Sequence, residues 1–214
     1  MVLVLGGLLF DPLVSEAGDD SSYLLEAMKF SRGEAFPGFH GMFYSLMIGV
    51  LIRLFGFNLV FFKLLSLVFL LAHQTFFYLS FRKKVSPFLL SSALLISSVS
   101  SGLLYFGSHT YTEAFFMFLQ ASFFYILSLG FLEVPGNFKH VRNYWKYYLS
   151  LGAVLFIMTT TRNLGLVAIL TVVIYFLIQK KYVPILYTLV SYLVFNLPYT
   201  LYKKLVWNTE GSEM

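Results

Sequence analysis

The chain has 214 residues, of which 58% are hydrophobic and 12% are charged, and its mean hydropathy is +0.78. This composition excludes an ordinary soluble domain and indicates an integral membrane protein. The formal net charge of +5 is small, and no basic run with interleaved aromatic residues suggests a nucleic-acid partner. The absence of cysteine excludes disulfides, thiolate metal sites and a cysteine nucleophile.

The chain begins with an apolar stretch, residues 1–14, which is shorter than the ~20 residues that a spanning helix needs. It lacks the basic flank and the small-residue cleavage site of a signal peptide, so we expect a short first membrane helix. Residues 15–57 are expected to form an outer loop with two interfacial helices. The first of these helices begins at Asp19 and Asp20, where a glycine, two carboxylates and two serines are typical of a helix start, and it ends at Gly33.

The second helix of the outer loop is expected between Gly41 and Phe57. A membrane crossing here would leave only residues 56–58 for the turn into the next span, and it would place the basic residues 82–84 on the same face as the acidic pair. We therefore expect a helix that lies in the outer interface or dips partway into the membrane. Arg53 suits this depth, because a charge at the bilayer centre costs ~2.5 kcal/mol or more. The alternative is a tight helical hairpin from which Arg53 snorkels.

Residues 58–202 are expected to contain about six spans, followed by a polar tail, 203–214. The apolar segments are 58–81, 86–106, 111–132, 148–161, 164–178 and 182–202. The segment 148–161 is short, so its helix is expected to begin near Tyr144. No second domain, internal repeat or low-complexity segment is visible, which indicates a single all-α membrane module over residues 1–214.

Basic residues indicate the orientation, because Lys and Arg collect in cytoplasmic loops. Two apolar spans separate each consecutive pair of basic clusters, so all three clusters fall on one face, which we expect to be cytoplasmic. The clusters are Arg82, Lys83 and Lys84; Lys139, Arg142 and Lys146; and Lys180 and Lys181. The opposite face receives seven of the ten acidic residues: Asp11, Glu16, Asp19, Asp20, Glu26, Glu34 and Glu113.

The acidic face carries the candidate carboxylates. Asp19 and Asp20 either cap a helix and are solvated, or act as a general base or metal ligand beside a low-dielectric wall. Glu113 either complements the positive end of the helix that it opens, with Thr110 as an alternative cap, or supplies a third carboxylate.

The candidate cations and polar residues follow the same reasoning. Arg162 either snorkels, pairs with Glu113, or binds a phosphate at membrane depth. His40 is either a polar loop residue or part of a site. Lys63 lies inside a span, close enough to the outer end to snorkel. Deeper in that span, His73 and Gln74 are expected to hydrogen-bond to neighbouring helices.

Taken in order, these residues resemble the GT-C superfamily of membrane glycosyltransferases, which includes the protein O-mannosyltransferases, the lipid A aminoarabinose transferases and bacterial family-39 enzymes. The first outer loop of that family opens with an acidic pair on a helix with Tyr and Ala at set spacings, which here are Asp19, Asp20, Tyr23 and Ala27. Its next helix is entered through His-Pro-Pro-Leu and ends in Leu-Phe-Gly. Here His40 and residues 54–56 match, Tyr44 is present, and the two prolines are missing. Two later family motifs also align: the start of the next helix with Lys63, and the acidic residue at the head of a span after the second outer loop with Glu113.

The resemblance implies a polytopic GT-C-like bundle that transfers a sugar from a polyprenyl-phosphate donor to a hydroxyl of an unknown lipid, glycan or protein acceptor, with inversion. By resemblance, Asp19 or Asp20 is the general base, and the other orients the acceptor together with Glu113. Some relatives use a divalent cation and some do not; if one is bound here, Asp20 and Glu113 are its expected ligands. Arg162, His40, Tyr23 and Lys63 are then expected to bind substrate. The implied location is the bacterial inner (plasma) membrane, with the active face outward among membrane lipids.

A rival interpretation is a non-catalytic membrane protein, such as a transporter, a scramblase or an assembly partner. No paired broken helices in matching halves indicate a transporter. Family members, however, usually have more spans and often a further outer domain. We expect the chain to be part of a GT-C module, because its first helix is short and because Lys203 and Lys204 fall on the outer face if the last span crosses.

Overall fold

In the computed structural model of the chain, the described residues are 7, 19–38, 41–130 and 144–207. Within these ranges the regular structure is helical and no strand occurs, as the sequence predicts. The helices are α2 (Asp19–Ser31), α3 (Met42–Phe55), α4 (Leu59–Phe81), α5 (Pro87–Ser98), α6 (Ser101–Gly107), α7 (Thr112–Gly130), α9 (Trp145–Thr161), α10 (Gly165–Ile178) and α11 (Tyr182–Trp207). The expected first helix, residues 1–14, lies outside the described residues apart from Gly7.

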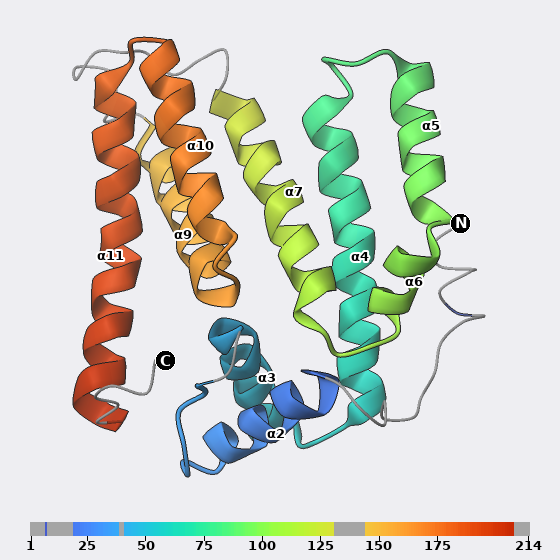
Figure 1. Ribbon diagram of the computed structural model, residues 1–214, viewed down its shortest axis with the longest axis vertical. Helices are drawn as coiled ribbons and strands as arrows, with labels where there is room; N and C mark the ends of the chain where they lie inside the picture. Colours follow the sequence, from blue (N-terminus) through green and yellow to red (C-terminus); the bar gives the residue numbers. More distant parts are fainter. Residues whose placement is uncertain (1–6, 8–18, 39–40, 131–143, 208–214) are drawn as a thin grey trace.

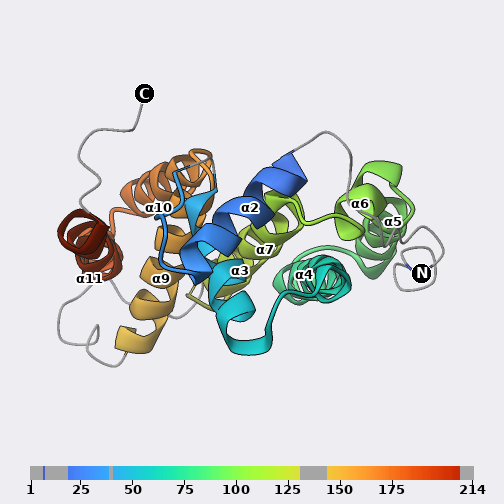
Figure 2. The same cartoon turned by 90° about the horizontal axis from the view of Figure 1, so that it is seen from below.

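The helices are arranged around one long axis, with two helices lying across one end. Helices α4, α7, α9, α10 and α11 run along this axis, and α2 and α3 lie across the lower end in Figure 1, as the view from below in Figure 2 also shows. We call this end the α2–α3 end; α4, α7 and α10 begin there, and α9 and α11 finish there. The links from α4 to α5 and from α10 to α11 lie at the opposite end.

Among the described residues, three helices are long and apolar enough to cross a membrane: α4, α7 and α11. Helices α5 and α6 pass the same test together, but they meet at a bend of 62°, so residues 86–106 do not form the single straight span that we expected. Helix α10 has 14 residues, or about 21 Å, which is shorter than the ~30 Å hydrocarbon core. The six expected spans are therefore represented by three helices of spanning length, or four if the bent pair is one span.

The bend between α5 and α6 has a cause in the local sequence. The hydroxyls of Ser97 and Ser98 both donate to the carbonyl oxygen of Leu94, at 3.0 and 2.6 Å. Serine hydroxyls that bond to nearby backbone groups compete with the regular helical pattern, and two more serines follow at 100 and 101. The serine-rich stretch therefore ends α5 before the predicted span is complete.

Helix α4 places the acidic pair and the first basic cluster far apart. It has 23 residues, or about 34 Å, and it runs from the α2–α3 end to the link that carries Arg82. Helix α3 is only 14 residues long, and Arg53 in its last turn is exposed. Asp20 and Arg82 thus lie at opposite ends of the bundle, and α3 lies at the same end as α2.

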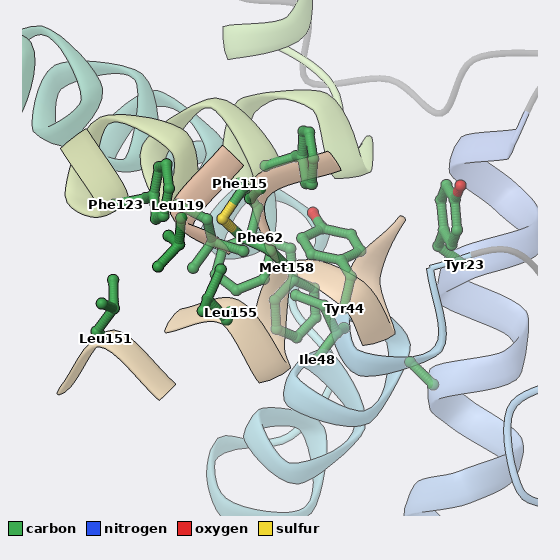
Figure 3. Close-up of a cluster of buried hydrophobic side chains, with 14 of the residues drawn as sticks. Tyr23, Tyr44, Ile48, Phe62, Phe115, Leu119, Phe123, Leu151, Leu155 and Met158 are labelled. Carbon is green, nitrogen blue, oxygen red and sulfur yellow. The ribbon is translucent and has the colours of Figure 1, made fainter. Parts of the chain in front are cut away.

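A single hydrophobic core joins α2 and α3 to the bundle. It contains Tyr23 and Ala27 of α2 and Tyr44 and Ile48 of α3, together with buried residues of α4, α7, α9 and α10. Figure 3 shows part of this cluster, with Tyr44 beside Ile48 and Met158. Burying an aromatic side chain stabilises the fold by roughly 1.5–3 kcal/mol, so α3 and α2, which carries the acidic pair, are held by the same core as the spans.

Helices α9 and α11 cross closely at Gly152. A Cβ at this position would lie 2.6 Å from the backbone carbon of Ser191, which is nearer than real Cβ atoms approach. The close crossing holds the two helices together, and both run toward the α2–α3 end. It also explains a glycine in the interior of a helix, where glycine otherwise costs about 1 kcal/mol relative to alanine.

Polar and apolar side chains of the long helices are distributed as a membrane requires. His73 Nδ1 lies 2.9 Å from the carbonyl oxygen of Met117, and Gln74 Nε2 donates to Ser97 Oγ at 2.8 Å, so both predicted interhelical contacts are confirmed. Large apolar side chains such as Phe88 and Ile178 are 79% and 77% exposed on the outside of the bundle. Several apolar helices with such outward faces agree with an integral membrane protein.

Candidate functional site

The α2–α3 end brings together five of the predicted site residues from three helices. Asp19, Asp20 and Tyr23 come from α2, Glu113 from the first turn of α7, and Arg162 from the end of α9. His40 lies outside the described residues. The remaining candidate, Lys63, belongs to α4 and has a different environment, described below.

Asp20 links α2 to the loop that precedes α7. Its side chain is fully buried, and its Oδ1 accepts a hydrogen bond from the backbone N–H of Thr110 at 3.0 Å, across 90 residues of sequence. The expectation that a member of the pair is merely solvated is wrong for Asp20, because its side chain is fully buried and its Oδ1 is bonded to another segment. Nor does the Thr110 hydroxyl cap α7, since it has no hydrogen-bond partner among the described residues.

Asp19 is the accessible member of the acidic pair. It is exposed, whereas Asp20 is fully buried and already bonded. A general base must reach the proton that it removes. The geometry therefore separates the two carboxylates: Asp20 fixes the loop before α7, and Asp19 is free to face a substrate.

Glu113 and Arg162 form an ion pair between α7 and α9. Arg162 Nη1 donates to Glu113 Oε1 at 2.7 Å, and the two side chains are 38% and 26% exposed, respectively. The pairing that the sequence left open for Arg162 is thus present. A guanidinium has five N–H donors, and this contact uses one of them, so a second anion can still bind to the same group.

Tyr23 connects Asp19 to the ion pair. Its hydroxyl hydrogen-bonds with the side chain of Thr112, and it lies within electrostatic reach of Asp19, Glu113 and Arg162. Burial raises the pKa of Tyr23; the two carboxylates raise it further, and the Thr112 bond and the Arg162 charge act in the opposite direction. Tyr23 therefore stays protonated at neutral pH and can donate a hydrogen bond at the site.

Gly41 lets the start of α3 approach these residues. Its φ of 86° is left-handed, and a Cβ there would lie 2.7 Å from Thr112 Cγ2 and 3.1 Å from Tyr23 Cε1. The Thr161 carbonyl oxygen, just before Arg162, would be 3.4 Å from the same Cβ. Both the positive φ and the lack of room for a Cβ favour glycine at this position. The residues around Arg162, Tyr23 and Thr112 therefore meet at the first turn of α3.

Lys63 lies inside the bundle and does not snorkel. Its side chain is fully buried on α4 beside Phe62 and Ser66, and it takes part in an interaction in the interior. A buried ammonium needs a compensating partner, because desolvation of a lone charge is costly. The expectation that Lys63 reaches the surface is wrong, and its position makes it a support of the fold beneath the site.

Tyr44 is a site neighbour to which sequence reasoning assigned no role. Burial raises its pKa, and the carboxylates of Asp20 and Glu113 add to this effect. Its ring packs edge-on against Tyr23 at 5.7 Å. Thr112 was also missed; the adjacent Glu113 was the one signal in the sequence that pointed to this position.

The two carboxylates expected to hold a divalent cation, Asp20 and Glu113, already make other contacts. Mg²⁺ and Ca²⁺ take at least six oxygen ligands, of which several come from the protein or from ordered water. Asp20 Oδ1 accepts from Thr110, and Glu113 Oε1 accepts from Arg162. Within the described ranges, no three His, Asp or Glu side chains come together as metal ligands.

No family model, no curated protein and no solved structure matches the chain.

Proposed function

We propose that the α2–α3 end is the active face of a membrane glycosyltransferase of the GT-C type. In this proposal the chain transfers a sugar from a polyprenyl-phosphate donor to a hydroxyl of a lipid, glycan or protein acceptor. The observation that carries it is that an exposed carboxylate, Asp19, and a partly exposed guanidinium, Arg162, both lie within electrostatic reach of Tyr23. A base and a fixed cation are the two groups that such a transfer needs.

The reaction would proceed as a single displacement. Asp19 takes the proton of the acceptor hydroxyl as the acceptor oxygen attacks the anomeric carbon. The bond between this carbon and the donor phosphate oxygen breaks, and that oxygen leaves with the electron pair as part of polyprenyl phosphate. Attack and departure occur on opposite sides of the carbon, so the configuration is inverted. A positioned general base contributes ~10²–10⁴-fold to the rate.

Arg162 would stabilise the departing phosphate. Its planar fork binds two phosphate oxygens, and the contact with Glu113 holds the guanidinium in place before the donor arrives. Because Asp20 and Glu113 already make other contacts, this proposal assigns the electrostatic role to Arg162. Chelation of divalent cations should then leave the rate unchanged.

The site would lie where the phosphate of a lipid-linked donor sits. Helices of spanning length begin or end at the α2–α3 end, so this end falls near one membrane surface. The described basic residues 82–84 and 180–181 lie at the other end, and in this proposal that end is cytoplasmic and the active face points outward. We propose the plasma membrane of a bacterium as the location.

A transfer assay tests this function. The purified protein in liposomes is given a panel of radiolabelled polyprenyl-phosphate monosaccharides, and release of polyprenyl phosphate is measured. Wild type should turn over at least one donor, and Arg162→Ala should lose this activity. Arg53→Ala is the matched control, because Arg53 is exposed at the far end of α3. Failure of wild type to process any donor would contradict the proposal.

A non-catalytic membrane protein is the second candidate. The ion pair between Arg162 and Glu113 is compatible with this candidate, because such a pair can hold α7 and α9 together without taking part in a reaction. In that case Arg162→Ala would lower the melting temperature, and neither wild type nor variant would release polyprenyl phosphate.

A further inference from the structure

Lys203 of α11 brings a second cation to the α2–α3 end. Its Nζ lies 3.8 Å from Met42 Sδ, and the Tyr199 hydroxyl lies 3.9 Å from the same sulfur. Met42 is the first residue of α3 and follows Gly41, which packs against Tyr23 and Thr112. The ammonium therefore lies next to the turn around which the site residues gather.

Aromatic contacts fix this part of α11. Tyr199, Lys203 and Trp207 are spaced by four residues, so they share one face of the helix. The rings of Phe30 and Phe36, on the α2 side, lie 5.7 and 5.9 Å from the ring of Trp207. Phe36 also lies 6.1 Å from Tyr199. The face with Lys203 is thereby held against the α2–α3 segment.

Lys204 provides a contrast on the same helix. Lys203 is half-buried, whereas Lys204 is exposed. Adjacent helix residues point about 100° apart, so Lys204 does not share the face that contacts Met42. A lysine that served only to anchor α11 at the membrane surface would resemble Lys204 and would not need the aromatic surroundings of Lys203.

Two cations thus come from segments that approach the start of α3. Arg162 follows Thr161, whose carbonyl oxygen approaches Gly41, and Lys203 approaches Met42. Glu113 neutralises part of the Arg162 charge, and Lys203 adds another positive charge. Gly41 supplies no side-chain cap to α3, so the positive end of the helix adds to the attraction for an anion. An anion with several oxygens, such as a phosphate, suits this arrangement.

We infer that Lys203, acting with Arg162, binds the phosphate of a membrane-anchored phosphate ester. This inference rests on the proposed function, in which the ester is the polyprenyl-phosphate donor. Arg162 contacts the phosphate from the α9 side and Lys203 from the α11 side, while the hydrocarbon chain stays in the membrane beside the apolar helices. Lys203 is then a donor-binding residue, and α11 is a wall of the donor site.

Binding of a long-chain polyprenyl monophosphate to the protein in nanodiscs of zwitterionic lipid tests the inference. Lys203→Gln should weaken binding roughly 10-fold or more, because it removes a charge-assisted contact. Lys204→Gln should bind as wild type does, and Lys203→Arg should retain most of the affinity. Equal binding by Lys203→Gln and Lys204→Gln would overturn the inference. Matching melting temperatures for these variants show that the fold is kept.

Two further ligands identify the source of the phosphate. Inorganic phosphate at high concentration should compete with the polyprenyl probe, and absence of competition would mean that Lys203 does not bind the phosphate group. Phosphatidylglycerol in the nanodisc should compete weakly; displacement of the probe at equal concentration would point to a general headgroup site and overturn the donor assignment.

The binding and transfer experiments fail independently. If wild type binds the probe and transfers sugar, but Lys203→Gln binds equally well, the inference is wrong and the proposed function stands. If binding depends on Lys203 but no donor is turned over, the phosphate site stands and the proposed function is wrong.

Discussion

Arg162 and Glu113 join the end of α9 to the start of α7 through a 2.7 Å contact across 49 residues of sequence. Both side chains are partly exposed, and ion pairs of this kind contribute only about 0–1 kcal/mol to stability. The main consequence of the pair is therefore geometric: it holds the guanidinium beside Tyr23 and the first turn of α3.

Replacing Arg162 should affect donor binding more than folding. Arg162→Lys keeps the charge but loses the planar fork, so it should weaken polyprenyl-phosphate binding while the melting temperature stays close to that of wild type. Arg162→Ala should abolish binding. Titration with the lipid and thermal denaturation of the same samples provide the two readouts. A large fall in melting temperature with unchanged binding would mean that the pair only stabilises the helix junction.

The two members of the acidic pair should behave differently. Asp19→Asn should lower the transfer rate ~10²–10⁴-fold with little change in stability, because Asp19 is exposed and acts as the base in our proposal. Asp20→Ala leaves the buried Thr110 N–H without its acceptor and should destabilise the fold by about 1–3 kcal/mol.

Glu34 is the control for the acidic pair, because it is an exposed acid at the end of the α2 segment, and its 3.8 Å ion pair with Arg32 lies at the surface, where such pairs contribute only about 0–1 kcal/mol. Glu26 does not serve, since it accepts a hydrogen bond from the Gly38 N–H at 3.3 Å. Glu34→Gln should leave rate and stability unchanged. A similar small loss of rate in the Asp19 and Glu34 variants would remove Asp19 from the reaction.

Alanine at Gly41 should destabilise the protein more than alanine at Gly33. Both glycines have positive φ, so each substitution costs roughly 1–2 kcal/mol for the left-handed backbone. At Gly41 the new methyl group also meets Thr112 at 2.7 Å, whereas at Gly33 nothing lies within 4 Å. Overpacking adds about 1–3 kcal/mol. Chemical denaturation of the two variants should show this difference, and equal stabilities would mean that α3 does not pack tightly on Tyr23 and Thr112.

The two ends of α4 should face opposite sides of the membrane. The chain has no cysteine, so Ser21→Cys and Ser86→Cys each introduce a single reactive thiol at an exposed position. A membrane-impermeant maleimide should label one variant in intact cells and the other only after the membrane is opened. Labelling of both from the same side would contradict a crossing by α4.

Local patterns predicted much of the fold. The apolar run 58–81 became α4 with Asn58 as its cap, and the helix expected from about Tyr144 begins at Trp145. The position of a helix depends largely on the length and composition of its own segment, and both can be read from a short window of sequence. The break in 86–106 was also signalled, by the serines at 97–101, but the high hydropathy of the segment concealed it.

Contacts between distant segments could not be predicted in this way. The partner of Asp20 is a backbone N–H 90 residues away, and backbone groups carry no sequence signal. The sequence places Lys63 near the outer end of its span, so we expected its side chain at the surface. The sequence does not show which helix packs over that side chain, and in the structure it is buried. For Lys203, the sequence indicated the correct end of the bundle, but its approach to Met42 depends on the packing of α11 against α2 and α3.

The central claim is that a lipid-linked phosphate binds at the α2–α3 end, and photo-crosslinking tests it most directly. A polyprenyl phosphate with a photoreactive group next to the phosphate is bound to the protein in nanodiscs, irradiated, and located by peptide mapping. We expect crosslinks in α3, at the end of α9 and at the end of α11, and we expect them to be lost in Arg162→Ala. Crosslinks at the links around Arg82–Lys84 and Lys180, or crosslinks spread evenly along the apolar helix faces, would contradict it.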